Sequence, residues 1–106
     1  MQALSLELYI GWYIQGWSLT PSLNLSLHIS HYDANRVLKV KNCKLIFTEL
    51  VNVSFQSVKQ IIGEQLCIHQ CITKKNDMGI LYYEIVLAPH GVVKISTRND
   101  VCITEY

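Results

Sequence analysis

Apolar and polar residues alternate along most of this chain, which is the period of a strand with one buried face. In segment 3–10 the leucine and isoleucine residues all fall on one face: Leu4, Leu6, Leu8 and Ile10, with Ser5, Glu7 and Tyr9 on the other. Segment 23–29 repeats the pattern, with leucine or isoleucine at every odd position. We predict a strand in each segment and, between them in residues 11–22, a tight aromatic connection that is itself part strand.

The next apolar run, residues 37–49, changes phase in the middle. Leu38 and Val40 share one face, whereas the apolar residues take the opposite parity from Cys43 to Phe47. A β-bulge adds one residue to one strand and so reverses the parity beyond it. We therefore predict a bulge near Asn42 that returns both halves of this strand to the core.

The remaining segments also favour strands. The alternation continues through Phe55, where we predict a strand. Residues 57–66 fit either a strand or a helical spacing, and we predict a loop with one helical turn in this segment. A strand from Gln65 to Thr73 follows. Three further runs separated by turn residues predict a meander; they are residues 80–88, 92–97 and 101–105.

Taken together, these elements predict an all-β fold. Eight or nine strands with short links and little or no helix are typical of an antiparallel β-sandwich or barrel. The 106 residues match the usual size of one domain, and we expect a single domain over 1–106. The sequence does not decide between sandwich and barrel.

The composition predicts more apolar surface than one small domain can bury by itself. Half of the residues are hydrophobic and only 16% are charged, against roughly 25% charged in a typical globular protein. The net charge of +1 gives no long-range attraction to nucleic acid. The first residues lack the features of a signal peptide, so we expect a cytoplasmic protein with reduced thiols, no membrane partner, and some apolar surface covered by another protein or by a second copy.

Aromatic and basic residues are the candidate interface. Aromatic side chains of the kind enriched at binding hot spots gather in a stretch without charge: Tyr9, Trp12, Tyr13 and Trp17. Cations cluster on the third predicted strand, where Arg36, Lys39, Lys41 and Lys44 form a basic strip and Lys39 and Lys41 share a face; of these, Arg36, Lys39 and Lys41 are the candidate interface residues. The alternatives are a tryptophan that fills the core and lysines that only keep an edge strand from pairing.

Candidate chemistry is sparse. On a strand, Cys67, His69 and Cys71 would project from one face, but their spacing matches no standard zinc pattern. His28, His31 and Asp33 are too loosely spaced for a metal or acid–base site. The chain contains no nucleophile elbow, P-loop or HExxH motif. We therefore predict a protein without enzymatic activity, metal or cofactor.

The apolar pattern of residues 37–104 resembles small bacterial all-β domains of unknown function, some of which are immunity proteins of toxin systems. The resemblance lies in Val40-x-x-Cys43-x-Leu45-Ile46-Phe47-x-x-Leu50-x-x-Val53, followed by Tyr83-Glu84-Ile85-Val86-Leu87 and Gly91-Val92-Val93-Lys94-Ile95. It implies a binding protein that acts by occlusion. Those families tend to be acidic, whereas this chain has a basic middle, which argues against a nuclease toxin as the partner.

The functional expectation is thus a protein-binding module of the immunity or inhibitor type, which occludes a partner through an apolar, aromatic sheet face. A self-associating structural module, forming a homodimer, is the first alternative. The second is a small-ligand-binding barrel whose mouth is lined by Trp12, Tyr13 and Trp17.

Overall fold

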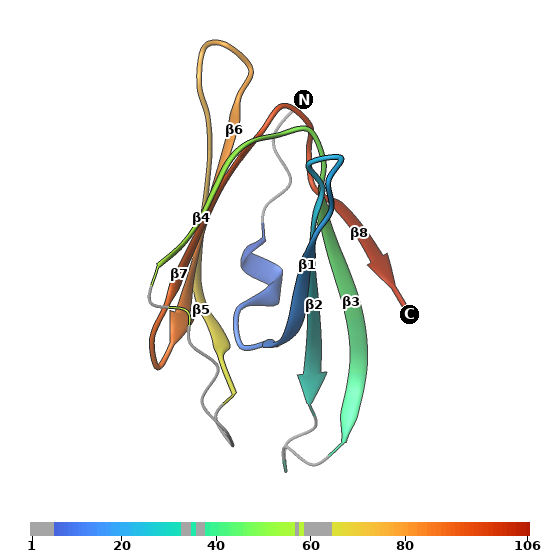
Figure 1. Ribbon diagram of the computed structural model, residues 1–106. Helices are drawn as coiled ribbons and strands as arrows, with labels where there is room; N and C mark the ends of the chain where they lie inside the picture. The colour runs from blue at the N-terminus through green and yellow to red at the C-terminus, as the bar shows by residue number, and fades with distance from the viewer. Residues whose placement is uncertain (1–5, 33–34, 36–37, 57, 59–64) are drawn as a thin grey trace.

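The strands are all antiparallel, as the computed structural model shows for residues 6–32, 35, 38–56, 58 and 65–106 (Figure 1). In chain order the elements are the 3-10 turn η1 (Glu7–Tyr9), β1 (Tyr13–Leu19), β2 (Leu25–Tyr32), β3 (Lys39–Phe47), β4 (Leu50–Gln56), β5 (Cys67–Lys75), β6 (Leu81–Ala88), β7 (Val92–Thr97) and β8 (Cys102–Glu105). Within the described part of the chain, eight strands and almost no helix confirm the predicted fold class. None of the described residues belongs to a helix long and apolar enough to cross a membrane.

The described strands form one hydrogen-bonded sheet of eight, which folds into two layers that face each other (Figure 1). One layer has the order β4-β7-β6-β5 and the other β1-β2-β3-β8. The layers join at one end, where Tyr13 of β1 lies opposite Cys67 of β5 and the amide of Ile68 donates to the carbonyl of Trp12 at 2.8 Å. The architecture is therefore a sandwich whose layers share one short pairing.

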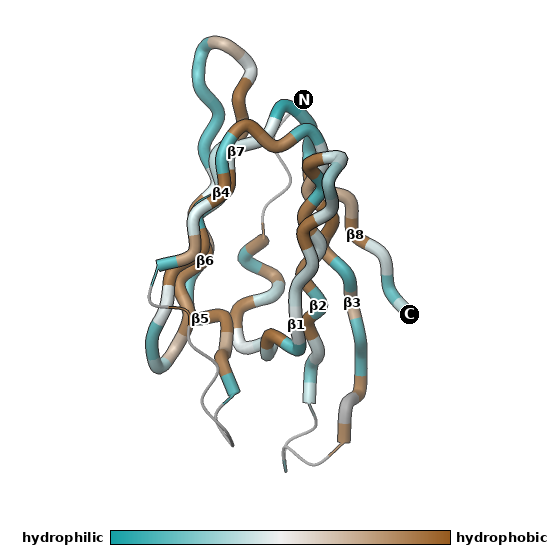
Figure 2. The backbone as a smooth tube through the Cα atoms, viewed as in Figure 1, coloured by the Kyte–Doolittle hydropathy of each residue, from teal (hydrophilic) through white to brown (hydrophobic). Residues whose placement is uncertain are grey.

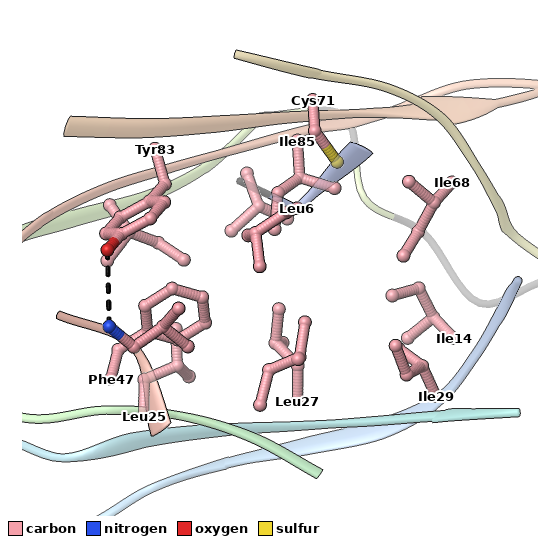
Figure 3. Close-up of a cluster of buried hydrophobic side chains, with 14 of the residues drawn as sticks. Leu6, Ile14, Leu25, Leu27, Ile29, Phe47, Ile68, Cys71, Tyr83 and Ile85 are labelled. Carbon is pink, nitrogen blue, oxygen red and sulfur yellow. Dashed lines mark hydrogen bonds between the residues drawn. The ribbon is translucent and has the colours of Figure 1, made fainter. Parts of the chain in front are cut away.

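Hydrophobic and hydrophilic residues alternate along strands of both layers (Figure 2), and alternate side chains of β2, β6 and β7 are buried. Buried residues of β2 and β3 face those of β5, β6 and β7 in one cluster (Figure 3). At one end of this cluster, Phe47 of β3 meets Tyr83 of β6 edge to face, with ring centroids 5.2 Å apart. This contact stabilises the packing of one layer on the other.

The N-terminal segment is not a strand in the described residues, which corrects the prediction for residues 6–10. Leu6 is buried, but Leu8 is 81% exposed and Ile10 is 46% exposed, so the three residues do not share a face. A strand needs a neighbouring edge, and the described part of this segment pairs with none. Its backbone instead closes a 3-10 turn, in which the amide of Tyr9 donates to the carbonyl of Leu6 at 3.0 Å.

The predicted bulge in β3 exists, but two residues earlier than expected. His31 lies opposite Lys41, and the next residue, Tyr32, lies opposite Lys39, so Val40 is the extra residue. The bulge does not bring the first half of the strand inward. Leu38 and Val40 are both exposed, which makes their predicted core positions wrong.

The C-terminal strands do not form a three-strand meander. β6 and β7 pair as a hairpin, as predicted, but β8 crosses to the other layer and pairs with β3, where Ile103 lies opposite Leu45. At the crossing the backbone amide of Val101 donates to the hydroxyl of Tyr83 at 3.2 Å. The turn at residues 98–101 therefore connects the layers instead of joining two adjacent strands.

Candidate protein-binding surface

The side chains of β1 include two that point toward the interior and are nevertheless exposed. Trp17 lies opposite Leu27, and Leu19 lies opposite Leu25; directly opposite residues share a face of the sheet, and both leucines are fully buried. Yet Trp17 is 38% exposed and Leu19 is 53% exposed. The sandwich is therefore open beside this half of β1.

β4 forms the other side of the opening. Val53 lies opposite the buried Ile95, and Phe55 lies opposite the buried Val93, so both also face inward, while each is only partly buried. Trp17 stacks on Phe55 across the opening, with ring centroids 5.4 Å apart and an angle of 26° between the rings. One aromatic pair thus bridges two strands that are not neighbours in the sheet.

The turn between β1 and β2 completes this surface. Its geometry is local: the amide of Leu23 donates to the carbonyl of Thr20 at 3.0 Å, and the amide of Asn24 donates to Oγ1 of Thr20 at 3.2 Å. Leu23 has a φ of +61°, a left-handed conformation that leucine rarely adopts. It is 57% exposed, and its carbonyl accepts a hydrogen bond from the amide of Leu50 at 3.3 Å.

A groove of about 260 Å³ lies between this turn and β4. We call the groove together with the aromatic pair the seam. Its residues are Trp17, Leu19, Leu23, Leu50, Val51, Asn52, Val53 and Phe55. Neither β1 nor β4 contains a charged residue, so the seam offers an apolar, neutral surface with no acid, base or metal ligand.

The four predicted aromatic interface residues do not form one patch. Only Trp17 lies in the seam. Tyr9 contacts Trp12 edge to face at 5.0 Å, and Trp12 stacks on His31 at 5.4 Å, in a part of the molecule that packs against the core. Tyr13 contacts a further residue, Tyr32 of β2, at 5.4 Å. The ring contacts therefore place the two tryptophans in separate clusters.

The basic strip is only partly described. Arg36 and the side chain of Lys39 lie outside the residues that the structure describes. Lys41 is exposed on β3, opposite His31. The strip thus has no described contact with the seam.

The row of Cys67, His69 and Cys71 does not share one face, contrary to the prediction. Ile68 lies opposite Leu87 and Gln70 opposite Val86, so His69 is a bulged residue and the parity reverses after it. Cys71 therefore turns into the core, beside Leu6 and Ile85 (Figure 3), while His69 is exposed.

Other candidate ligands are likewise dispersed. Within the described residues, no three histidine, cysteine or acidic side chains are grouped so that they could hold a metal ion. Nδ1 of His28 lies 3.2 Å from the hydroxyl of Tyr106, whereas His31 stacks on Trp12. Asp33 lies outside the described residues.

The buried thiol of Cys71 gives a prediction for the pH dependence of stability. Burial, with a smaller contribution from the charge of Glu7, raises its pKa from 9.0 to about 11. The folded protein therefore holds this proton more tightly than the unfolded chain, and the resulting stabilisation is complete below about pH 9 and lost as the pH rises toward 11. The urea midpoint should fall over this interval, and it should fall less in Cys71→Ala.

The exposed thiol provides the control for that experiment. Cys102→Ala should keep the full wild-type loss of stability, because Cys102 is exposed on β8. Burial also raises the pKa values of Tyr83 and Cys43, so part of the loss should remain in every variant. Identical pH profiles for wild type and Cys71→Ala would contradict the assignment.

Most seam residues were not identified from the sequence. Leu19, Leu23, Val51 and Phe55 read as ordinary strand or turn residues. A usable signal was present: residues 13–19 and 50–56 are two strands without any charge. The absence of charge indicates a binding surface only when the structure shows that β1 and β4 lie on either side of an opening.

Comparison with known proteins gives no further guidance, because no protein-family model, curated protein or solved structure matches this chain.

Proposed function

We propose that the protein is a non-enzymatic protein-binding module of the immunity or inhibitor kind, which docks through the seam and covers part of another protein. The observation that carries the proposal is the exposure of Trp17 and Leu19, which point in the same direction as buried core residues. Tryptophan is the residue type most enriched at interface hot spots. A partner that covers this surface would complete the core that the sandwich leaves open.

The dimensions and chemistry of the seam favour a protein over a small ligand. Pockets for small molecules usually measure about 300–1,000 Å³ and contain a few convergent polar groups. The groove measures about 260 Å³, and Asn52 is the one polar residue among those that line it. Such a groove fits one or two apolar side chains of a partner protein. The absence of charge in its lining also favours a neutral, apolar contact.

A substitution at Leu23 should separate binding from folding. Asparagine accepts positive φ values more readily than leucine, so Leu23→Asn should leave the free energy of unfolding unchanged or raise it by up to about 1 kcal/mol. It also removes an exposed apolar side chain from the groove. We expect the immobilised wild-type chain to capture a specific protein from an extract of the cells that encode it, and Leu23→Asn combined with Leu19→Thr to capture at least about tenfold less.

The control is Leu8→Asn, which removes a leucine outside the seam that is even more exposed than Leu19 and Leu23, and it should leave capture unchanged. If the wild-type chain captures nothing, or if the Leu19 and Leu23 substitutions leave capture intact, the proposed function is wrong.

A further inference from the structure

β4 has a free edge. It is the first strand in the sheet order and pairs on one side with β7. On its other side, the backbone contact among the described residues is the hydrogen bond from the amide of Leu50 to the carbonyl of Leu23. Beyond Leu50, the strand therefore presents peptide groups that another strand can pair with.

This edge lacks most of the features that prevent strand pairing in monomeric proteins. Natural edge strands are kept short, carry lysine or proline, or point a charge inward. β4 has seven residues with no charge and no proline. It does carry a bulge at Val51, between the pairs Leu50–Thr97 and Asn52–Ser96, but this leaves residues 52–56 regular. The opposite edge strand, β8, has four residues and contains Glu105.

We infer that β4 pairs in antiparallel register with β4 of a second copy of this chain, about a two-fold axis at Val53. In this register, which uses only the regular residues of β4, Val53 lies opposite Val53 of the second copy, so that two β-branched residues meet on the inner face. Asn52 lies opposite Ser54 of the second copy, so that polar residues meet on the outer face. No charge lies on either strand to oppose the pairing.

The same pairing covers the seam. Residues that are directly opposite share a face of a sheet, so both copies of Val53 and Phe55 stay on the inner side, and the second layers of the two copies approach each other there. Trp17 and Leu19 of one copy then lie beside those of the other. The inference rests on the proposed function, because it identifies a second copy of this chain as one protein that binds the seam. Any other partner can then bind the seam only after the dimer has dissociated.

A charge exchange tests both the pairing and its register. In the variant Asn52→Glu with Ser54→Glu, the two-fold axis sets carboxylates directly opposite each other twice. In the variant Asn52→Lys with Ser54→Glu, it sets an ammonium group opposite a carboxylate twice. Within one chain, Ser54 lies opposite Lys94 and Asn52 opposite Ser96, so both variants are compatible with folding.

Sedimentation equilibrium measures the outcome. The wild type should show twice the 12.2 kDa chain mass, the double-glutamate variant should dissociate at least about tenfold more readily, and the lysine–glutamate variant should dimerise at least as well as the wild type. Thr104→Lys on the other edge should leave the mass unchanged. Circular dichroism spectra that match the wild type establish that each variant is folded.

Two results would overturn the inference: a wild-type monomer at every concentration up to the millimolar range, or a dimer that responds alike to both charge variants. Neither result affects the capture experiment with Leu19 and Leu23. A monomer that captures a partner through the seam would refute the dimer alone, whereas a dimer that captures nothing would refute the proposed function alone.

Discussion

Replacing Phe47 with alanine should lower the free energy of unfolding by about 3–5 kcal/mol, which is the usual cost of removing a fully buried phenylalanine. Phe47 is completely buried, lies opposite the buried Leu25, and contacts Tyr83 of the other layer. The substitution therefore removes apolar contacts from both layers at once. Small domains have total stabilities of about 5–15 kcal/mol, so urea unfolding should show a large drop in the midpoint.

Phe55→Ala is the matched control, because the residue type is the same and the location differs. Phe55 also faces inward, but it lies in the seam, is only partly buried and stacks on the exposed Trp17. Water already reaches this site, so the loss should be clearly smaller than for Phe47. Equal losses at the two positions would mean that the seam is as well packed as the core, and the proposed docking surface would lose its basis.

The strands with regular pairing could be predicted from the sequence. In β2 the inward positions Leu25, Leu27 and Ile29 follow the apolar alternation, and all three are buried. In the β6–β7 hairpin, the same alternation places Tyr83 and Ile85 in the core. A period of two is a local property, and where no residue is inserted it determines which side chains enter the interior.

Bulges limited the prediction elsewhere. Four register shifts between the described strands, at Gln15, Val40, Val51 and His69, each reverse the parity of the residues beyond them. The apolar pattern predicts the shift in β3, but two residues too late, near Asn42 instead of Val40. It gives no sign of the shift at His69, so the face that it predicts for Cys71 is wrong. A bulge depends on the register with the partner strand, and that register cannot be predicted from the bulged strand alone.

The candidate site depended on long-range information in the same way. The sequence identifies Trp17 as a candidate because it is aromatic and lies in an uncharged stretch. Its stacking partner, Phe55, is 38 residues further along the chain, in a strand that is not its neighbour in the sheet. Which two strands flank the opening follows from the strand order, and the strand order is set by the packing of the whole chain.

Two leucines of the N-terminal segment test whether this segment is a strand, as its sequence pattern predicts, or a 3-10 turn, as the structure shows. If residues 3–10 formed a strand, Leu6 and Leu8 would share a face and have similar effects on stability. In the structure, Leu6 is buried between the two layers, beside Ile85 and Cys71 (Figure 3), whereas Leu8 is exposed on the 3-10 turn. Leu6→Ala should therefore cost about 2–5 kcal/mol, and Leu8→Ala less than about 0.5 kcal/mol.

The two variants form their own matched pair, since they differ only in which of two neighbouring leucines is shortened. Urea unfolding measures both values under the same conditions. The buried leucine fills space that neither layer fills by itself, so its truncation leaves a cavity that the rigid strands on either side cannot close. Similar losses for the two variants would show that the segment pairs as a strand, and then the 3-10 turn, the position of Leu6 and the local environment of Cys71 would all have to be revised.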